Sequence, residues 1–230
     1  MTRVRLNVRK NSAIQPVQVH INHLVIAGWT GRNQAAVNAH IQELAEIGVQ
    51  PPKRAPTFYR LSASLVTTAN CIQTIGSHSS GEAEFVLIHD LDQLLVGVGS
   101  DHTDRKAESI SVAVAKQMCP KPLGSDVWEF SRIEPHWDEL ILRSYMVGDN
   151  QRVIYQEGSV AAILHPKMLM KQYGEMAGRA FSAGMAMFGG TLPVIGERVP
   201  ASEFAVELED PVLKRTLTHT YAIDELPLES

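Results

Sequence analysis

The 230-residue sequence has few cysteines and no long apolar run. Cys71 and Cys119 are its only cysteines, which is too few for a disulfide framework. With no secretory signal in residues 1–10, this cysteine content favours a reducing cytoplasm. No stretch approaches the ~20 apolar residues that a membrane span requires. We therefore expect a cytoplasmic protein with no membrane partner.

Basic charge is also in short supply. The chain has 21 Lys and Arg against 25 Asp and Glu, a net charge of −4, and nucleic-acid binding needs a basic face. The Gly-rich patterns of nucleotide-binding loops are missing, so no nucleotide cofactor is expected. The histidines do not have the His-Glu-x-x-His spacing of zinc proteases. What remains is an ordinary globular composition, 44% hydrophobic and 20% charged, in a chain long enough to bury a core without disulfides.

Apolar periodicity predicts mostly strands. Two segments have helical signals: 33–47, with apolar residues at Val37, Ile41 and Leu44 and a stop at Gly48, and 166–177. Strands are expected over 2–9, 17–27, 58–65, 84–89, 94–98, 128–130, 140–147, 152–155, 185–188, 204–208 and 216–223. This pattern predicts a β-dominated α+β protein, in which a small N-terminal β-α portion (1–55) leads into a larger β core (56–230).

Two glutamates begin one of the most apolar strands. Glu82 and Glu84 stand at alternate positions of this segment, so they project from the same face of the strand, about 7 Å apart at Cα. Like charges placed side by side repel each other, and a shared cation would offset that repulsion. The alternative is that both carboxylates are solvated where the strand begins.

A hairpin brings a third carboxylate to the same place. If the turn is centred on residues 91 and 92, Glu84 faces Gly99 and Glu82 faces Asp101. Three carboxylates at one strand end would suit Mg²⁺, Mn²⁺ or Ca²⁺ better than Zn²⁺. From spacing alone, the alternative that Asp101 only caps a turn stays open.

Several short motifs occur in a characteristic order. They are Gly-Glu-Ala-Glu (81–84), Ser-Asp-His-Thr-Asp-Arg (100–105), Ala-Lys-Gln-Met-Cys-Pro (115–120), Tyr-Gln-Glu-Gly-Ser (155–159) and Gly-Gly-Thr-Leu-Pro-Val-Ile-Gly (189–196), preceded by Phe-Tyr-Arg (58–60). This order resembles the fumarylacetoacetate hydrolase (FAH) superfamily, and within it a FAH-like hydrolase branch. The resemblance implies a mixed β-sandwich roll, a homodimer and one divalent cation, Mg²⁺ or else Mn²⁺ or Ca²⁺, held by Glu82, Glu84 and Asp101.

The resemblance also implies an activity. A divalent-metal-dependent hydrolase would cleave a C–C or related bond in a small 2-oxo or 1,3-dicarbonyl carboxylate, through a metal-stabilised enolate. A decarboxylase, an isomerase or a dehydratase on the same fold would use the same enolate. A protein of a different class, a non-catalytic ligand-binding protein that keeps the fold, is the third alternative.

By the same resemblance, three residues would carry the catalysis. Lys116 would sit on the oxyanion side of the substrate or hold a water, although lysines are usually exposed. His40 and Glu43 have the spacing of a water-activating dyad on a lid helix, and at i and i+3 they share one side of the helix. A surface His–Glu pair on an ordinary amphipathic helix is the alternative.

Substrate binding would involve four further residues. Thr191 and the preceding Gly190 would bind the substrate carboxylate, or only form a turn. Gln156 would line the pocket, or only shape a strand end. Arg32 would clamp an anionic group of the substrate, or only begin the helix that follows it.

Overall fold

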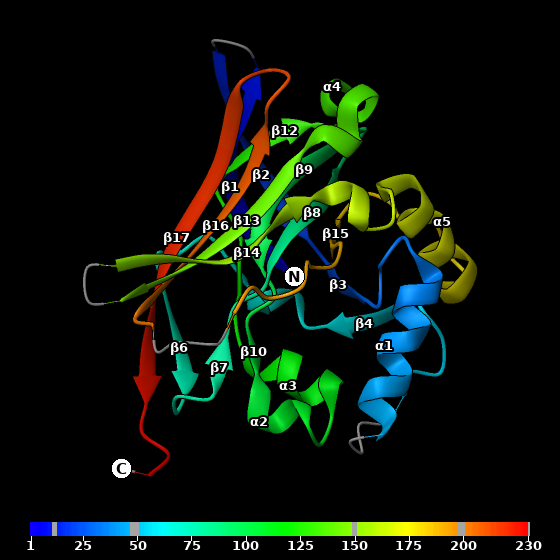
Figure 1. The fold of residues 1–230 in the computed structure, drawn as a ribbon. Coiled ribbons are helices and arrows are strands. Elements are labelled where there is room, and N and C mark those ends of the chain that lie inside the picture. Colours follow the sequence, from blue (N-terminus) through cyan, green and yellow to red (C-terminus); the bar gives the residue numbers. More distant parts are fainter. Residues whose placement is uncertain (11–12, 47–50, 149–150, 197–200, 230) are drawn as a thin grey trace.

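The computed structural model describes residues 1–230 except 11–12, 47–50, 149–150, 197–200 and 230. The side chains of His40 and Leu44 also lie outside the described part of the structure. Two large sheets form the molecule (Figure 1). The first has eight strands in the order β2 (Ala13–Ile21), β1 (Thr2–Lys10), β12 (Asp126–Glu129), β9 (Gln93–Ser100), β8 (Ala83–Asp90), β15 (Met185–Phe188), β3 (His23–Gly28) and β4 (Thr57–Leu61). The second has five, in the order β14 (Gln151–Ser159), β13 (Ile141–Gly148), β16 (Glu203–Asp210), β17 (Arg215–Leu226) and β6 (Cys71–Ile75).

Two small sheets lie beside these. One pairs β10 (Thr103–Asp104) with β7 (Ser79–Ser80), and the other pairs β11 (Lys121–Pro122) with β5 (Val66–Thr67). The helices are α1 (Gln34–Glu46), α2 (Arg105–Glu108), α3 (Val112–Met118), α4 (Phe130–Ile133) and α5 (Pro166–Ala177), with 3-10 turns at Ala63–Leu65, Glu134–Glu139 and Val160–Ala162. The architecture confirms the expected β-dominated α+β class and its rolled, sandwich-like sheets.

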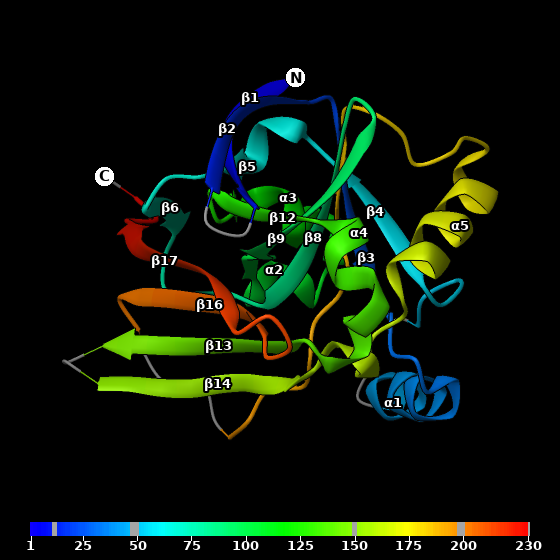
Figure 2. The same cartoon turned by 90° about the horizontal axis from the view of Figure 1, so that it is seen from above.

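The eight-stranded sheet rolls because of one short connection. Only Asn22 separates β2 from β3, although these strands lie at positions one and seven of the strand order. One intervening residue spans at most ~7 Å, so the sheet must curl until these positions approach each other (Figure 2). The prediction of a single strand over 17–27 is therefore wrong. The chain leaves one strand at Asn22, whose N–H donates to the Gly184 carbonyl at 2.7 Å, and enters another.

The central strand β8 is buried on both faces. Phe85 and Leu87 belong to the core between the two sheets, and Val86 and Ile88 belong to the core inside the roll. A strand with apolar contacts on both faces reads as a continuous apolar run, and this is how residues 85–88 appear in the sequence. Side chains at the beginning of β8 are consequently held on a rigid element.

Capping explains where the helices begin and end. Asn33 accepts hydrogen bonds from Ala35 and Ala36 at 3.1 and 3.2 Å, so α1 begins one residue later than the predicted 33–47 helix. The predicted stop at Gly48 lies outside the described residues. The predicted 166–177 helix is confirmed as α5, which ends where Gly178 adopts a left-handed conformation, φ 65°.

Some boundaries differ from the sequence expectation. The strand expected over 58–65 ends at Leu61 and is followed by the Ala63–Leu65 turn. The short helices α2 and α3 have no long apolar period, and the sequence did not predict them. Asp104 begins α2 by accepting from the Ala107 N–H at 2.7 Å, and Ser111 begins α3 by accepting from the Val114 N–H at 3.4 Å.

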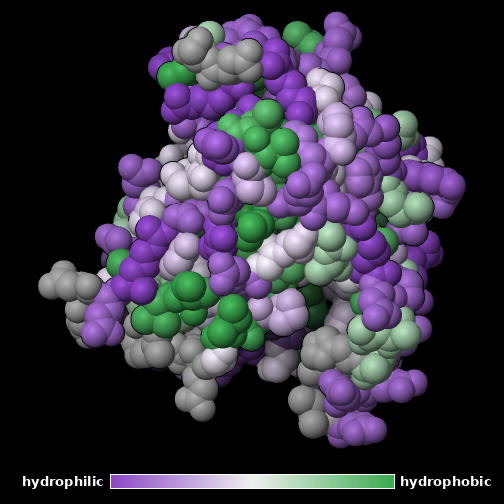
Figure 3. Space-filling view, turned by 45° about the horizontal axis from the view of Figure 1, so that its top comes forward, coloured by the Kyte–Doolittle hydropathy of each residue, from purple (hydrophilic) through white to green (hydrophobic). Residues whose placement is uncertain are grey.

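Residues 1–55 supply three strands and one helix. β1, β2 and β3 all hydrogen-bond into the eight-stranded sheet, whereas α1 lies outside it (Figure 1). The division into 1–55 and 56–230 stays a prediction. Among the described helices none is long and apolar enough to cross a membrane. The face in Figure 3 is mostly hydrophilic, with hydrophobic residues in scattered groups.

Candidate functional site

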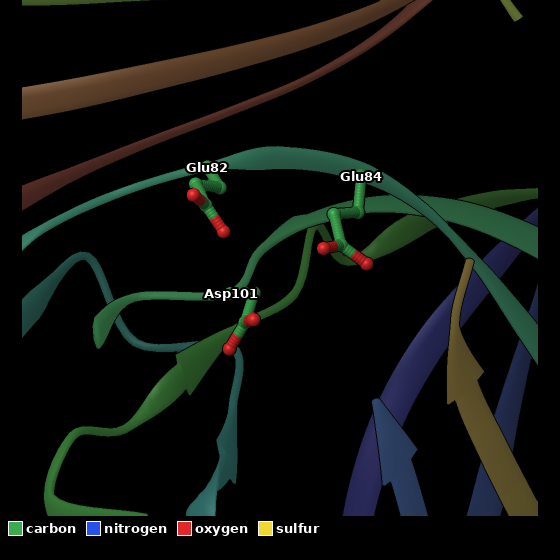
Figure 4. A group of neighbouring side chains, drawn as sticks. All are labelled: Glu82, Glu84 and Asp101. Carbon is green, nitrogen blue, oxygen red and sulfur yellow. The ribbon is translucent and has the colours of Figure 1, made fainter. Parts of the chain in front are cut away.

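Three carboxylates meet where the β8–β9 hairpin opens. Glu84 lies opposite Gly99, and the Asp101 N–H donates to the Glu82 carbonyl at 3.0 Å, which confirms the predicted register. One carboxylate oxygen from each of Glu82, Glu84 and Asp101 lies within 4.8 Å of the other two. Figure 4 shows the three side chains as neighbours at this end of the hairpin. We call these residues the acidic triad.

The members of the acidic triad differ in their access to solvent. Glu84 and Asp101 are 2% and 0% exposed, while the side chain of Glu82 is 20% exposed. Gly99 leaves room for this arrangement, because a Cβ at that position would lie 2.6 Å from the Pro122 carbonyl oxygen. Solvent therefore reaches the triad on the side of Glu82.

Asp101 is held between two lysines. The Lys116 ammonium contacts Oδ2 of Asp101 and lies 4.0 Å from Glu82, and the Lys121 ammonium lies 3.1 Å from Oδ1. Burial alone would raise the pKa of Asp101, but the two lysines outweigh it and lower the pKa to about 2. Asp101 is therefore a carboxylate at every physiological pH.

Lys116 is buried, so the alternative of an exposed surface lysine is wrong for this residue. It lies on α3, whose start at Ser111 turns the lysine toward the hairpin end. Burial lowers the pKa of Lys116, but Asp101 and Glu82 outweigh that effect, and the net pKa is raised. The side chain thus stays a charged ammonium beside the acidic triad.

Lys121 is a site residue that sequence reasoning missed. Its side chain is 0% exposed, and its ammonium also donates to the His102 carbonyl. Burial lowers the pKa of Lys121 by more than the negative charge of Asp101 raises it, so the net pKa is lowered. The only local signal is a lysine between Pro120 and Pro122 in a segment that is otherwise uncharged.

Arg105 is the second missed residue. Its guanidinium lies 3.0 Å from Glu82, 2.9 Å from Glu108 and 2.7 Å from the Ser80 hydroxyl. Burial lowers the pKa of Arg105, but Glu82 and Glu108 outweigh it and raise the pKa overall. The arginine belongs to the 100–105 motif, and its spacing from Asp101 was the signal that could have given it a role.

Glu84 is the member of the triad without a cationic partner. In the described part of the chain, no lysine or arginine lies within 4.0 Å of its carboxylate, and the Gly190 N–H donates to its Oε2 at 2.8 Å. Burial first, and then the charge of Asp101, raises the pKa of Glu84 well above its usual value. A buried carboxylate in this position takes up either a proton or a cation.

Gly190 reaches Glu84 because of its backbone conformation. Its φ of 105° is unfavourable for residues with a side chain, and a Cβ would lie 1.8 Å from the Thr30 hydroxyl. Its N–H is used by Glu84, so the predicted contact of Gly190 with a substrate carboxylate is not available through this group. Gly190 instead orients one ligand of the candidate metal site.

Thr191 and Gln156 connect three segments beside the triad. The Thr191 hydroxyl donates to the Ala83 carbonyl at 2.8 Å and accepts from Gln156 at 2.7 Å. Gln156 is fully buried, and its amide also bonds the Ala83 N–H, the Ser144 hydroxyl and the Leu192 carbonyl. Of the two sequence alternatives for Gln156, the structure favours the one in which it shapes a strand end.

Residues 27–221 match the family described as "Protein of unknown function (DUF2848)". The chain belongs to this family. No curated protein matches its sequence. Among solved structures, the chain is similar to a yeast protein of the fumarylacetoacetate hydrolase family, with a TM-score of 0.64 and 14% identity over 89% of this chain and 93% of that one.

Two further structures are similar at comparable scores. The fumarylpyruvate hydrolase of Pseudomonas aeruginosa, solved in complex with Mn²⁺ and pyruvate, has a TM-score of 0.59 and 13% identity over 97% of each chain. A 2-keto-3-deoxy-D-arabinonate dehydratase in its apo form has a TM-score of 0.62 and 13% identity over 94% of this chain and 78% of that one. This DUF2848 chain therefore has the fold of the FAH superfamily, as the order of its motifs predicts.

Among the described residues, the structure records no contact of Arg32 or Glu43 with the triad. Both terminal nitrogens of Arg32 donate to Asp138, at 2.7 and 2.8 Å, which favours its structural alternative over an anion clamp. Glu43 is exposed on α1. The side chain of His40 lies outside the described part of the structure, so the proposed dyad stays a prediction.

The residues of this DUF2848 chain fit a divalent cation. The triad offers only carboxylate oxygens, the donors that Mg²⁺, Mn²⁺ and Ca²⁺ prefer. Glu84 is buried and forms no ion pair with a lysine or arginine in the described structure, and the nearby Lys116 charge does not offset its burial, because the pKa of Glu84 is still raised. The three carboxylate donors and the unpaired Glu84 carboxylate both favour a divalent cation as the ligand.

Proposed function

We propose that this protein is a divalent-metal-dependent enzyme that hydrolyses a C–C bond in a small 2-oxo or 1,3-dicarbonyl carboxylate. The observation that carries the proposal is the convergence of Glu82, Glu84 and Asp101 within 4.8 Å, next to the buried ammonium of Lys116. The fumarylpyruvate hydrolase of similar fold, solved with Mn²⁺ and pyruvate, supports the choice of metal and substrate class.

Glu82, Glu84 and Asp101 would hold the cation, Mg²⁺ or Mn²⁺. When bound, the cation would polarise the oxygens of a 2-oxo acid and stabilise the negative charge that develops on them. Gly190 orients Glu84, because its N–H binds Oε2 and leaves Oε1 without a hydrogen bond among the described residues. Lys121 and Lys116 orient Asp101 by binding one carboxylate oxygen each, so a cation would share these oxygens with the two ammonium groups. Orienting contacts of this kind are a normal part of a metal site.

Lys116 has the properties of an oxyanion-stabilising residue. It remains an ammonium, lies beside the triad and is shielded from bulk water, and these conditions strengthen its hydrogen bonds to a developing negative charge. In the hydrolysis, the oxygen of a water molecule bonds to the distal carbonyl carbon and the adjacent C–C bond breaks. The electron pair of that bond stays on the 2-oxo acid fragment, which then takes up a proton.

His40 and Glu43 would activate this water. Both belong to α1, and histidine is suited to accept a proton near neutral pH. A lyase reaction of the same 2-oxo acid class, such as a dehydration or a decarboxylation, would need no attacking water, and neither would an isomerisation. The dehydratase of similar fold supports this as the second candidate.

One assay separates these candidates. Purified protein with Mn²⁺ or Mg²⁺ is incubated with an acylpyruvate, a 2-keto-3-deoxy sugar acid and oxaloacetate, and products are followed by chromatography. We expect metal-dependent cleavage of the acylpyruvate, abolished by EDTA and by Glu84→Gln. His40→Ala should abolish hydrolysis but leave a lyase reaction intact.

Other outcomes would contradict the proposal. Turnover of the sugar acid or oxaloacetate alone would favour the lyase, and metal binding without turnover would favour the non-catalytic ligand-binding protein. Cleavage that persists in Glu84→Gln with EDTA would remove the triad from the mechanism. The homodimeric state, the cytoplasmic location and the small carboxylate substrate remain predictions.

A further inference from the structure

A row of side chains crosses the eight-stranded sheet at the end of β8 that is opposite to the triad. Met185 of β15 pairs with both His23 of β3 and His89 of β8, and His89 pairs with Leu94 of β9. Residues in register project from the same face, and Met185 belongs to the core between the sheets. His89 comes five residues after Glu84, roughly 17 Å along the strand.

A cavity of about 650 Å³ is lined by His89 and Leu94 of this row, by α5 and by the residues that follow α5. The residues that the argument uses from its lining are His89, Leu94, Met170, Lys171, Arg179 and Phe181. α5 lies near β3 and β4 in both ribbon views (Figures 1 and 2). The cavity therefore has an apolar side, formed by leucine, methionine and phenylalanine, and a side formed by basic residues.

Arg179 is placed by the end of α5. Gly178 takes the left-handed conformation that ends the helix, and the Arg179 guanidinium then donates to the sulfur of Met185 at 3.6 Å. Sulfur is a weak acceptor, so this contact leaves most of the guanidinium's hydrogen-bonding capacity unused. The guanidinium consequently lies next to the strand position that separates His23 from His89.

Two arginines at this end of the sheet have no carboxylate partner in the described structure, whereas Lys171 in the cavity lining lies 3.9 Å from Glu175. The Arg60 guanidinium lies 2.6 Å from Nδ1 of His23, and within the described ranges no Asp or Glu forms an ion pair with Arg60 or Arg179. By contrast, Arg32 and Arg143 each bind a carboxylate. Burial first, then the charges of Arg60 and Arg179, lowers the pKa of His23. The cluster has the electrostatic character of an anion site.

His89 lines the cavity and carries an unpaired polar atom beneath its surface. Its Nδ1 is buried and has no hydrogen-bond partner in the described structure, while its ring packs near Phe181 with a centroid distance of 6.2 Å. Leaving a buried polar atom unpaired costs roughly 1–3 kcal/mol, so such atoms often mark the place of a missing partner. Nδ1 is not open to the cavity with the ring as it stands, so a ligand there would become its partner only after the imidazole turns.

We propose that this cavity is a second binding site, which takes a small organic oxyanion with an apolar body. The carboxylate or phosphate group would lie among Arg179, His89 and the neighbouring basic residues. The apolar body would pack against Phe181, Leu94 and Met170. The site lies at the other end of β8 from the triad and is independent of the proposed metal-dependent reaction.

The test measures binding of three ring compounds to the full chain by isothermal titration calorimetry, in EDTA and at constant ionic strength. Phenyl phosphate and phenylacetate carry the expected anionic group, and benzyl alcohol is the neutral match. We expect phenyl phosphate, phenylacetate or both to bind with Kd below about 1 mM and the alcohol to bind at least ~10-fold more weakly, because a charged hydrogen bond contributes more than an apolar contact. Which anion binds distinguishes the phosphate source from the carboxylate source.

Variants locate the binding. Arg179→Gln should weaken anion binding by about 10-fold or more, which is the effect of losing one charge-assisted hydrogen bond. His89→Leu should also weaken it while leaving thermal stability unchanged or higher, because an unpaired polar atom is removed. Arg5→Gln, an exposed arginine on β1, removes the same charge elsewhere and should change Kd less than about 2-fold.

Three results would each overturn the site. The first is no heat of binding for either anion at about 10 mM. The second is equal affinity for benzyl alcohol, which would make the cavity merely apolar. The third is equal weakening by Arg5→Gln and Arg179→Gln, which would reduce the effect to net charge. Circular dichroism of each variant checks that the fold is retained.

Discussion

Two groups of ionic side chains in this protein use the same chemistry in different surroundings. On the five-stranded sheet, Arg143 lies between Glu157 and Glu209, and Arg152 binds Glu207. Three of these side chains are 34–49% exposed, so water solvates them whether or not they pair. Exposed pairs of this kind contribute ~0–1 kcal/mol each to the free energy of unfolding.

The second group surrounds the acidic triad and is mostly buried. Asp101, Lys116 and Lys121 are nearly inaccessible, so each needs its partner to offset the loss of hydration. Glu84 is equally buried but has no cationic partner in the described chain. Thus losing an ion pair on the sheet surface should change the free energy of unfolding little, whereas losing one in the buried group should change it strongly. The buried group also contains one carboxylate without an ion-pair partner among the described residues, Glu84, as expected of a binding site.

Among the changes considered, Asp101→Asn should lower the free energy of unfolding most. This change leaves Lys121 buried without a countercharge, and breaking a buried pair in this way costs about 3–5 kcal/mol. Urea unfolding with EDTA present measures the loss. A cost below about 1 kcal/mol would show that Lys121 finds another partner or gains access to water.

Metal binding should have the next largest effect on the free energy of unfolding. Mn²⁺ at 100 times its Kd should raise the free energy of unfolding by about 2.7 kcal/mol, seen as an increase in Tm. Glu84→Gln should remove most of this shift, because a ligand charge is lost while an oxygen still accepts from Gly190. Without metal the variant should be as stable as the wild type or more so. An unchanged Mn²⁺ shift in the variant would exclude Glu84 as a ligand.

The pH dependence separates the two buried carboxylates. The pKa of Glu84 is higher in the folded state than in the unfolded state. Glu84 therefore contributes its full share to the free energy of unfolding below its unfolded pKa of about 4.3, and this share is lost as pH rises through the folded pKa. The pKa of Asp101 is lowered to about 2, so its contribution is present above an unfolded pKa of about 3.9 and is lost as pH falls toward 2.

In EDTA, the stability advantage of Glu84→Gln over the wild type should therefore grow as pH rises from roughly 4.5 to 8. Denaturant unfolding at several pH values measures this difference. Mn²⁺ should reverse the trend, because the metal requires the deprotonated carboxylate. A difference that is independent of pH would mean that the Glu84 pKa is not raised.

The smallest effect is expected on the exposed sheet. Glu157→Gln removes one of the two partners of Arg143, and the cost should be ~0–1 kcal/mol, falling further at high salt. The Mn²⁺ shift in Tm should match that of the wild type. A loss comparable to that of Asp101→Asn would show that exposure does not separate the two groups.

Predictions from the sequence succeeded where the interactions are local. The turn at residues 91 and 92 sets the hairpin register, and alternation along the strand sets which side chains share a face, so the meeting of Glu82, Glu84 and Asp101 could be foreseen. The helix over 166–177 followed from its period and its Gly178 cap. Conversely, the break at Asn22 was missed because both sides of it have strand-like residues.

The amino-acid sequence alone determined the hairpin, its register, the acidic triad and the α+β class, because strand alternation and turn geometry depend on neighbouring residues. Tertiary structure alone decided that Lys121 and Arg105 form ion pairs with the triad and that Arg32 pairs with Asp138. It also decided that His89, with its buried unpaired nitrogen, lines a cavity. Each of these depends on segments that are distant in sequence packing together. Burial sets the desolvation cost and the interaction energy of each of these charges, and it is defined only when the segments have packed together.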